Sequence, residues 1–331
     1  MPIKGFNGFL FIGDPHLASH RPGTRTDDYT NAILDKLDQA AEIATKLNLV
    51  PLFLGDLFHK ASENNLRLFS RLTDICRKFP LMPKTLEGNH DKAETRLTES
   101  DALDFMHKTH VVDVITQLGL VDEYEFHGQR VRLYAVPYGA EIPAELPEEE
   151  GVINVIMTHH DLNFSGAHVG CKPLSEIKGC QMLVNGQLHK TLPSFWCGKT
   201  RAHNPGNIAR LSIDVRDATP AVWSWGPDSG DFELTRHALK FNPDVFDMTG
   251  HHVDPARPKV SVNVLEKSVF AELLAGQSKM EGERSDDASS TRADLKATYE
   301  KLGTTEPAQL LLNRLLRETV KVLKDSVEVE Q

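Results

Sequence analysis

Cysteine is scarce in this chain, and long apolar runs are absent. Four cysteines among 331 residues are too few for a disulfide framework. The longest apolar stretches, such as Phe9 to Ile12, are only a few residues long, whereas a membrane-spanning helix needs about 18. The N-terminus shows no basic region followed by an apolar run and a small-residue cleavage site, so we expect no secretory signal. These absences predict a soluble, cytoplasmic protein with no membrane association.

Basic residues are outnumbered by acidic ones. Lys and Arg total 37 against 47 Asp and Glu, a formal net charge of −10 with histidine neutral. This balance argues against unspecific binding of polyanions by the whole surface. The net charge is still compatible with a local patch of basic residues. Residues 168–216 carry seven Lys and Arg against two acidic residues, a net charge of +5, which is the pattern expected beside a phosphodiester substrate.

The first half of the chain alternates between short apolar runs and longer amphipathic ones. We expect strands at 8–12, 50–54 and 84–86, and helices at 30–47, 66–79 and 101–108. This βαβα rhythm indicates a parallel sheet covered by helices. Further along, the chain becomes strand-rich, with runs at 111–115, 120–126, 131–136, 152–157, 182–184, 208–213, 221–225 and 232–238. The sequence therefore predicts an α/β fold, a two-layered sandwich of sheets with helices outside.

The last part of the chain has a different composition. We expect one domain over residues 1–245 and a small α-rich extension over 246–331, with a flexible linker around 276–291 that is rich in Ser, Asp, Glu and Gly. Pro307 suits the first turn of an amphipathic helix that runs to Lys324. Such a helix either covers the core of its own domain or docks on a partner, and the pattern alone leaves both open.

Polar clusters follow the predicted strands at the point where each strand ends. They are Asp14-Pro15-His16, Gly55-Asp56, Gly88-Asn89-His90-Asp91, His159-His160 and Gly186-Gln187-Leu188-His189. Each cluster alone suits a turn, but their recurrence at strand exits indicates a shared metal site, because the carboxyl ends of such strands gather ligands. Adjacent residues on a strand point to opposite faces, so only one of His159 and His160 can face this site.

Carboxylate, imidazole and amide groups suit the hydrolysis of phosphate esters. Two divalent ions about 3.5–4 Å apart hold a water, lower its pKa and neutralise phosphoryl oxygens. A carboxylate can bridge the ions, while imidazole nitrogens and amide oxygens complete shells suited to manganese, iron or zinc.

The order of these clusters resembles the calcineurin-like metallophosphoesterase superfamily, over about residues 9–211. The resemblance implies a β-sandwich flanked by helices and two divalent metal ions, which we expect to be manganese. It implies that Asp14, His16, Asp56 and His189 hold the first ion, and that Asp56, Asn89, His159 and Gln187 hold the second. His90 would be the catalytic acid that stabilises the transition state or protonates the leaving oxygen.

The last motif departs from the superfamily pattern. Gly-His-x-His is replaced by Gly186-Gln187-Leu188-His189, and Gln187 offers only a neutral amide oxygen. The second metal site is therefore expected to be weak, to hold a harder ion or to fill only with substrate. The alternative is that one metal has been lost, leaving a catalytically weakened subunit that binds DNA ends as a scaffold.

The segments between the clusters resemble the SbcD-type DNA-repair nucleases. The matching features are Arg25 and Asp27-Asp28 after the first cluster, Gly55-Asp56-Leu57-Phe58-His59, Tyr134 to Tyr138, and Asn204-Pro205-Gly206-Asn207. This resemblance implies a manganese-dependent exonuclease or endonuclease acting on DNA, working as a homodimer with an SbcC-type coiled-coil ATPase. His59 contacts the substrate, positions the bridging water, or is a surface histidine at the start of a helix. A phosphodiesterase or phosphatase for nucleotides or other small phosphates is the alternative enzyme.

Overall fold

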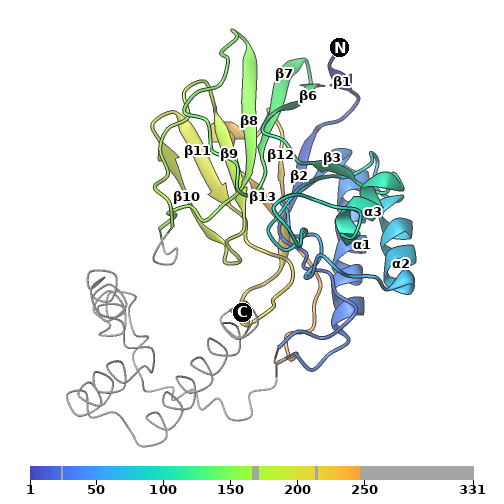
Figure 1. Ribbon diagram of the computed structural model, residues 1–331. Coiled ribbons are helices and arrows are strands. Elements are labelled where there is room, and N and C mark those ends of the chain that lie inside the picture. The colour runs from blue at the N-terminus through green and yellow to red at the C-terminus, as the bar shows by residue number, and fades with distance from the viewer. Residues whose placement is uncertain (24, 166–170, 213–214, 247–331) are drawn as a thin grey trace, which may run out of the picture. The chain divides into compact units, whose positions relative to one another are not determined.

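The computed structural model describes residues 1–23, 25–165, 171–212 and 215–246, and these form two β-sheets that pack face to face with helices on one side (Figure 1). The seven-stranded sheet has the order β1 (Ile3–Lys4), β6 (Gly119–Phe126), β7 (Gln129–Val136), β8 (Val152–His159), β9 (Met182–Gly186), β11 (Thr200–Asn204) and β10 (Leu192–Cys197). The six-stranded sheet has the order β13 (Thr235–Ala238), β12 (Ala221–Trp225), β2 (Gly8–Ile12), β3 (Leu49–Phe53), β4 (Lys84–Leu86) and β5 (Asp113–Ile115). The predicted α/β sandwich is confirmed.

The central strands of the six-stranded sheet are buried on both faces. Strands β2, β3, β4 and β5 pair in parallel, which is the expected βαβα arrangement. In β2, Phe9 and Phe11 pack in the core between the sheets, while Leu10 and Ile12 pack against the helices. A strand covered on both sides has no polar face, which explains why its sequence is a continuous apolar run.

Three helices cover the outer face of the six-stranded sheet: α1 (Tyr29–Leu47), α2 (Leu66–Cys76) and α3 (Ala102–Lys108) (Figure 1). The side chain of Asp28 caps α1 by accepting a hydrogen bond from the backbone N–H of Asn31. Asn48 ends the same helix in the left-handed conformation. Helix α2 ends three residues earlier than predicted, at Cys76.

The outer face of the seven-stranded sheet is covered by residues of two loops, one between β7 and β8 and one between β8 and β9. Leu146, Leu162, Phe164 and Ile177 pack there against side chains of β7, β8 and β9. The prediction of outer helices therefore holds for the outer face of the six-stranded sheet. On the outer face of the seven-stranded sheet, apolar residues of these two loops take the place of helices.

Several strands differ from the prediction. The expected strand at 208–213 is wrong over its described part, residues 208–212, which lie outside any strand. Ile208 and Ala209 are apolar because this loop is buried, and the N–H of Ile208 donates to the carbonyl of Gly13. The antiparallel hairpin of β10 and β11 was not predicted, because Pro193 and half-exposed side chains obscure the alternation.

The predicted extension over 246–331, its linker at 276–291 and the helix from Pro307 to Lys324 lie outside the described residues, apart from Phe246. Within the part of the chain that is described, no helix is both long enough and apolar enough to cross a membrane.

Candidate metal centre

The predicted polar clusters converge because their strands end at one edge of the sandwich. Asp14 and His16 follow β2, Asp56 follows β3, and Asn89 follows β4, three parallel neighbours in one sheet. His159 ends β8, and Gln187 and His189 follow β9, parallel neighbours in the facing sheet. The carboxyl ends of the two sets therefore bring together side chains from five separate parts of the sequence.

Two imidazoles and one carboxylate form the first half of the site. The Nε2 atom of His16 lies 2.9 Å from the Nε2 atom of His189. The same Nε2 atom lies 3.5 Å from Oδ2 of Asp56. His16 and Asp56 are both buried.

The second half of the site is built around His159. Its Nε2 atom lies 3.4 Å from Oδ2 of Asp56 and 3.3 Å from Oδ1 of Asn89. Its Nδ1 atom donates to the carbonyl of Leu54 at 2.6 Å and lies 3.4 Å from Oδ1 of Asp14. The bond to Leu54 uses the proton on Nδ1 and leaves Nε2 as the ring atom that faces Asp56 and Asn89. One carboxylate oxygen of Asp56 therefore lies between the two halves.

His159 is the last residue of β8, and His160, the next residue, points away from the side that His159 faces, as alternation along a strand predicts. His159 lies on the side of Val155 and Met157, which face the core between the sheets. The Nε2 atom of His160 instead donates to the carbonyl of Ala140 at 2.8 Å. The choice of His159 as the residue that faces the site agrees with this geometry.

Gln187 reaches the site through its backbone. Its N–H donates to Oδ1 of Asp14 at 3.3 Å, and its φ of +72° is in the left-handed region. Asp14, His16 and Asp56 also have positive φ, of 29°, 45° and 47°. Such conformations are uncommon for residues with a side chain and cluster at functional sites, where surrounding contacts hold them.

Two glycines let the strands approach the carboxylates. A Cβ at Gly88 would lie 2.1 Å from Oδ1 of Asp56, and one at Gly186 would lie 2.3 Å from the carbonyl oxygen of Leu54. Both distances are far below van der Waals contact, so the backbone can pass here only without a side chain.

Burial and neighbouring charges shift the pKa values of the central groups. Burial raises the pKa of Asp14 to about 7, against the opposing effect of His159. Burial disfavours the charged form of His159, but the carboxylates of Asp56 and Asp14 outweigh it and raise its pKa to about 9. Burial also disfavours the charged form of Asp56, yet His159 and His16 hold its pKa below the usual range. Burial, with His189 and His90 nearby, lowers the pKa of His16.

These groups fit a divalent cation. Oδ2 of Asp14 and Oδ2 of Asp56 are buried without a hydrogen-bond partner among the described residues, a costly arrangement for an acceptor unless a cation or a proton satisfies it. The two Nε2 atoms of His16 and His189 also face each other. Carboxylate oxygens, imidazole nitrogens and the amide oxygen of Asn89 form a donor set suited to manganese, iron or zinc.

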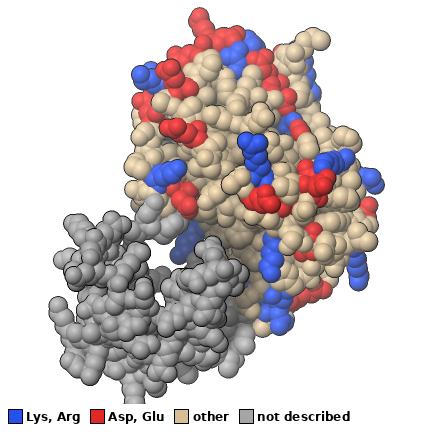
Figure 2. All heavy atoms as spheres, in the orientation of Figure 1, with Lys and Arg blue, Asp and Glu red and all other residues tan. Residues whose placement is uncertain are grey.

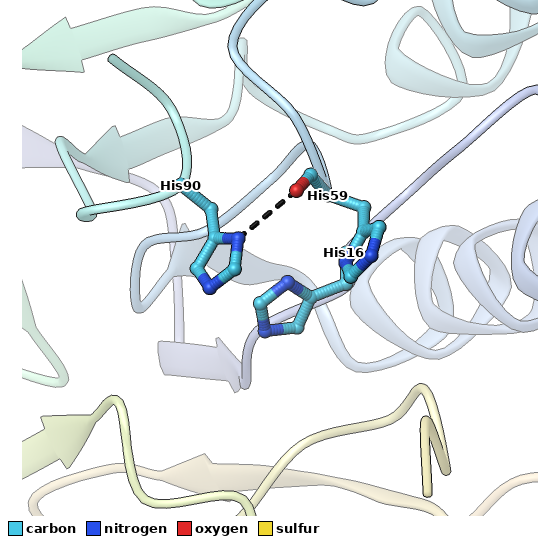
Figure 3. Close-up of side chains that lie close together, drawn as sticks. All are labelled: His16, His59 and His90. Atoms are coloured by element: carbon cyan, nitrogen blue, oxygen red, sulfur yellow. Dashed lines mark hydrogen bonds between the residues drawn. The ribbon is translucent and has the colours of Figure 1, made fainter. Parts of the chain in front are cut away.

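His90 and His59 lie beside this centre (Figure 3). The backbone N–H of His90 donates to Oδ1 of Asp56 at 2.9 Å, and its Nδ1 atom donates to the carbonyl of His59 at 2.9 Å. The rings of His59 and His90 stack with centroids 5.6 Å apart. One nitrogen from each of His16, His59 and His90 lies within 4.8 Å of the others. The structure thus places His59 at the site.

His59 is held neutral by its surroundings. Burial, together with the neighbouring His90 and His20, lowers its pKa to about 4. The ring of His20, which was not predicted as a site residue, lies 6.0 Å from that of His59.

Asp91 and Tyr138 are two further residues whose roles sequence reasoning missed. Asp91 is buried, and its two oxygens accept from the backbone N–H groups of Phe58 and Gly88 at 3.1 and 3.0 Å. It thereby ties the loop after β3 to the loop after β4. The ring of Tyr138 lies 6.2 Å from that of His159. Both residues lie within segments that the sequence analysis singles out, Asp91 in the cluster that begins at Gly88 and Tyr138 at the end of the segment from Tyr134, but neither was assigned a role.

The basic segment at 168–216 is engaged within the fold in at least two places. Arg210 is 2% exposed, and its guanidinium donates to the carbonyls of Asn242 and Pro243. Arg201 pairs with Glu233. Figure 2 shows basic and acidic side chains interspersed over the face in view. The expectation that the seven cations form a patch for phosphodiesters is therefore wrong for Arg210 and weakened for Arg201.

No family model and no curated protein matches this chain. Among solved structures, it is similar to a novel archaeal phosphodiesterase (13% identity, TM-score 0.35, 70% of this chain and 99% of that one). It is also similar to a 5′-nucleotidase precursor from Thermus thermophilus, with 13% identity and a TM-score of 0.40 over 72% of this chain and 55% of that one. A dimetal phosphatase from Danio rerio is similar with 11% identity and a TM-score of 0.42, over 71% of this chain and 99% of that one. The chain spans about half of the nucleotidase precursor.

Proposed function

We propose that this chain is a metal-dependent hydrolase of phosphate esters. The observation that carries the proposal is the position of Asp56, whose Oδ2 atom lies 3.5 Å from His16 Nε2 and 3.4 Å from His159 Nε2. A carboxylate between two sets of imidazole, carboxylate and amide donors is the arrangement that two bridged cations require.

The proposal assigns these side chains to two metal ions. Asp14, His16, Asp56 and His189 would hold the first ion, and Asp56, Asn89, His159 and Gln187 the second, with manganese as the expected metal. When bound, such ions lower the pKa of a water and neutralise charge on phosphoryl oxygens.

His90 supports the reaction from outside the metal shell. Because Nδ1 donates to the carbonyl of His59, the ring is fixed in one orientation with Nε2 at its other edge. A protonated Nε2 can give its proton to the leaving oxygen or donate to a phosphoryl oxygen. The stacked ring of His59 limits the movement of His90.

We propose DNA as the substrate, on the motif Gly55-Asp56-Leu57-Phe58-His59 and on the placement of His59 beside His90. The proposal includes the activity of an SbcD-like exonuclease or endonuclease subunit, a homodimer and an SbcC-type ATPase partner. The cytoplasmic location also remains a proposal.

A phosphodiesterase or phosphatase for nucleotides is the second candidate. The engagement of Arg201 and Arg210 within the fold favours it, because fewer cations remain to follow a DNA backbone. A scaffold subunit with one metal lost is the third reading, for which Gln187 is the motivation.

A substrate panel separates these functions. The full chain, supplied with manganese, is assayed on linear DNA, on a nucleotide and on bis-p-nitrophenyl phosphate, with Asp56→Asn as the inactive reference. Degradation of linear DNA supports the nuclease. Cleavage of the small esters alone supports the second candidate. If none of the three esters is hydrolysed, the proposal that this chain is an enzyme is contradicted.

A further inference from the structure

Three buried cations surround one pocket on the helical side of the molecule, apart from the candidate metal ligands. Arg25 is 3% exposed, and Lys36 and Arg210 are each 2% exposed. Arg25 lies in the loop before α1, Lys36 lies within α1, and Arg210 follows the buried loop at Ile208. Buried cations are rare unless an anion or acceptors satisfy them.

Two of these cations have partners. The guanidinium of Arg25 forms a two-point ion pair with Asp27 and donates to the carbonyls of Ala209 and Arg210. Arg210 donates to backbone carbonyls through both terminal nitrogens, while its Nε atom is buried with no hydrogen-bond partner in the described part of the chain. Asp27 is thus the one carboxylate paired with this group of cations, within the residues that the structure describes.

Lys36 is the exception among the three. Across residues 1–23, 25–165, 171–212 and 215–246, its ammonium group makes no hydrogen bond or ion pair. Burial, together with the charges of Arg25 and Arg210, lowers its pKa to about 7. An unpaired ammonium beside two guanidinium groups is unfavourable, and either loss of its proton or a bound anion relieves it.

A cavity of about 220 Å³ opens at these residues, lined by Arg25, Asp27, Asp28, Asn31, Ala32, Asp35, Lys36, Arg210, Lys240, Phe241 and Asn242. The ring of Phe241 packs on the guanidinium of Arg210, with the cation 4.7 Å from its centroid. The volume is below the roughly 300–1,000 Å³ typical of pockets for larger ligands. A small ion fits better than a nucleotide.

We propose that this pocket binds a small phosphate-type oxyanion, represented by inorganic phosphate, with Lys36 and Arg210 as its charged contacts. The carboxylates of Asp28 and Asp35, which are exposed, also line the cavity and repel polyanions. This arrangement favours a free ion over the end of a nucleic acid.

The pocket is linked to the candidate metal centre through the side chain of Tyr29. The hydroxyl of Tyr29 donates to the carbonyl of His16 at 2.8 Å, and its ring lies 5.1 Å from the guanidinium carbon of Arg25. Anion binding would therefore stabilise the segment that carries His16. The inference does not depend on the proposed hydrolase activity.

Calorimetric titration of the full chain with inorganic phosphate tests the site. The protein is first treated with a chelator, so that metal ions cannot hold the phosphate. The wild-type chain is expected to bind one phosphate, and Lys36→Met to bind it at least about tenfold more weakly, because a charged hydrogen-bond donor is lost. Lys46→Met, at an exposed lysine of the same helix, is the matched control and should bind as the wild type does.

Two further measurements keep the result interpretable. Thermal unfolding with and without phosphate should show stabilisation of the wild type and of Lys46→Met but not of a folded Lys36→Met. If Lys36→Met does not fold, Lys36→Arg provides the comparison and should still bind. The proposal is overturned if the wild type binds no phosphate at millimolar concentration, or if Lys36→Met binds it equally well. Tighter binding of a 5′-phosphorylated oligonucleotide than of phosphate would contradict the choice of a free ion.

Discussion

His16 and His189 are 173 positions apart in the chain, yet their Nε2 atoms lie 2.9 Å apart. Two imidazole nitrogens at this distance need a proton or a cation between them, because two lone pairs repel. Burial and the neighbouring His189 lower the pKa of His16, so that a proton is a poor partner for it. Asp56 stands beside the pair, and a divalent ion satisfies all three groups at once.

Replacing His90 with Ala should lower kcat about 100-fold or more and leave manganese affinity nearly unchanged. The contact between residue 90 and Asp56 is made by the backbone N–H, which the substitution retains. Steady-state kinetics on a small phosphodiester and manganese titration measure the two effects. Full turnover in the variant would remove His90 from the reaction.

Replacing Gln187 with His should raise manganese affinity about tenfold, if the side chain faces the second ion. Histidine tolerates positive φ better than most residues, so the +72° conformation should persist. Manganese titration by calorimetry gives the change. Unchanged affinity and unchanged activity would show that residue 187 acts only through its backbone N–H to Asp14.

Replacing Gly88 with Ala should abolish activity and destabilise the fold by about 1–3 kcal/mol, because the new Cβ would lie 2.1 Å from Oδ1 of Asp56. Gly230→Ala is the matched control, since a Cβ there meets nothing within 4 Å. Denaturant unfolding and the phosphodiester assay compare the two variants. Equal behaviour of both would mean that the loop after β4 does not pack against Asp56 as described.

Asp91 should make the metal-free protein less stable as the pH rises from about 4 to about 7. Burial, and then the charge of Asp56, raise the pKa of Asp91 from 3.8 to about 7. The folded state binds the proton of Asp91 more tightly than the unfolded state does. This difference contributes to the free energy of unfolding in full below pH 3.8, and the contribution is lost as the pH rises through about 7. Unfolding free energies of wild type and Asp91→Asn across this range should diverge with that sign. Parallel curves would contradict the shifted pKa.

The site was accessible from the sequence because it lies at strand exits. Short strands followed by Asp, Asn or His fix where the ligands meet, and alternation at the end of β8 separates His159 from His160. The proximity of Arg25, Lys36 and Arg210 has no such signal, because it arises only when the loop at Ile208 folds against α1. The apolar residues of that loop resemble a strand in sequence, but they are apolar because the loop is buried.

The most direct test compares the wild-type chain with Asp56→Asn. Both proteins are dialysed to equilibrium against saturating manganese, and the manganese bound per chain is measured. Asn keeps the shape of the side chain but loses the charged oxygen that lies between His16 and His159. Two ions per wild-type chain, with a clear loss in the variant, are the result expected of a bridged pair. Fewer than one ion per wild-type chain, or the same content in both proteins, would contradict it.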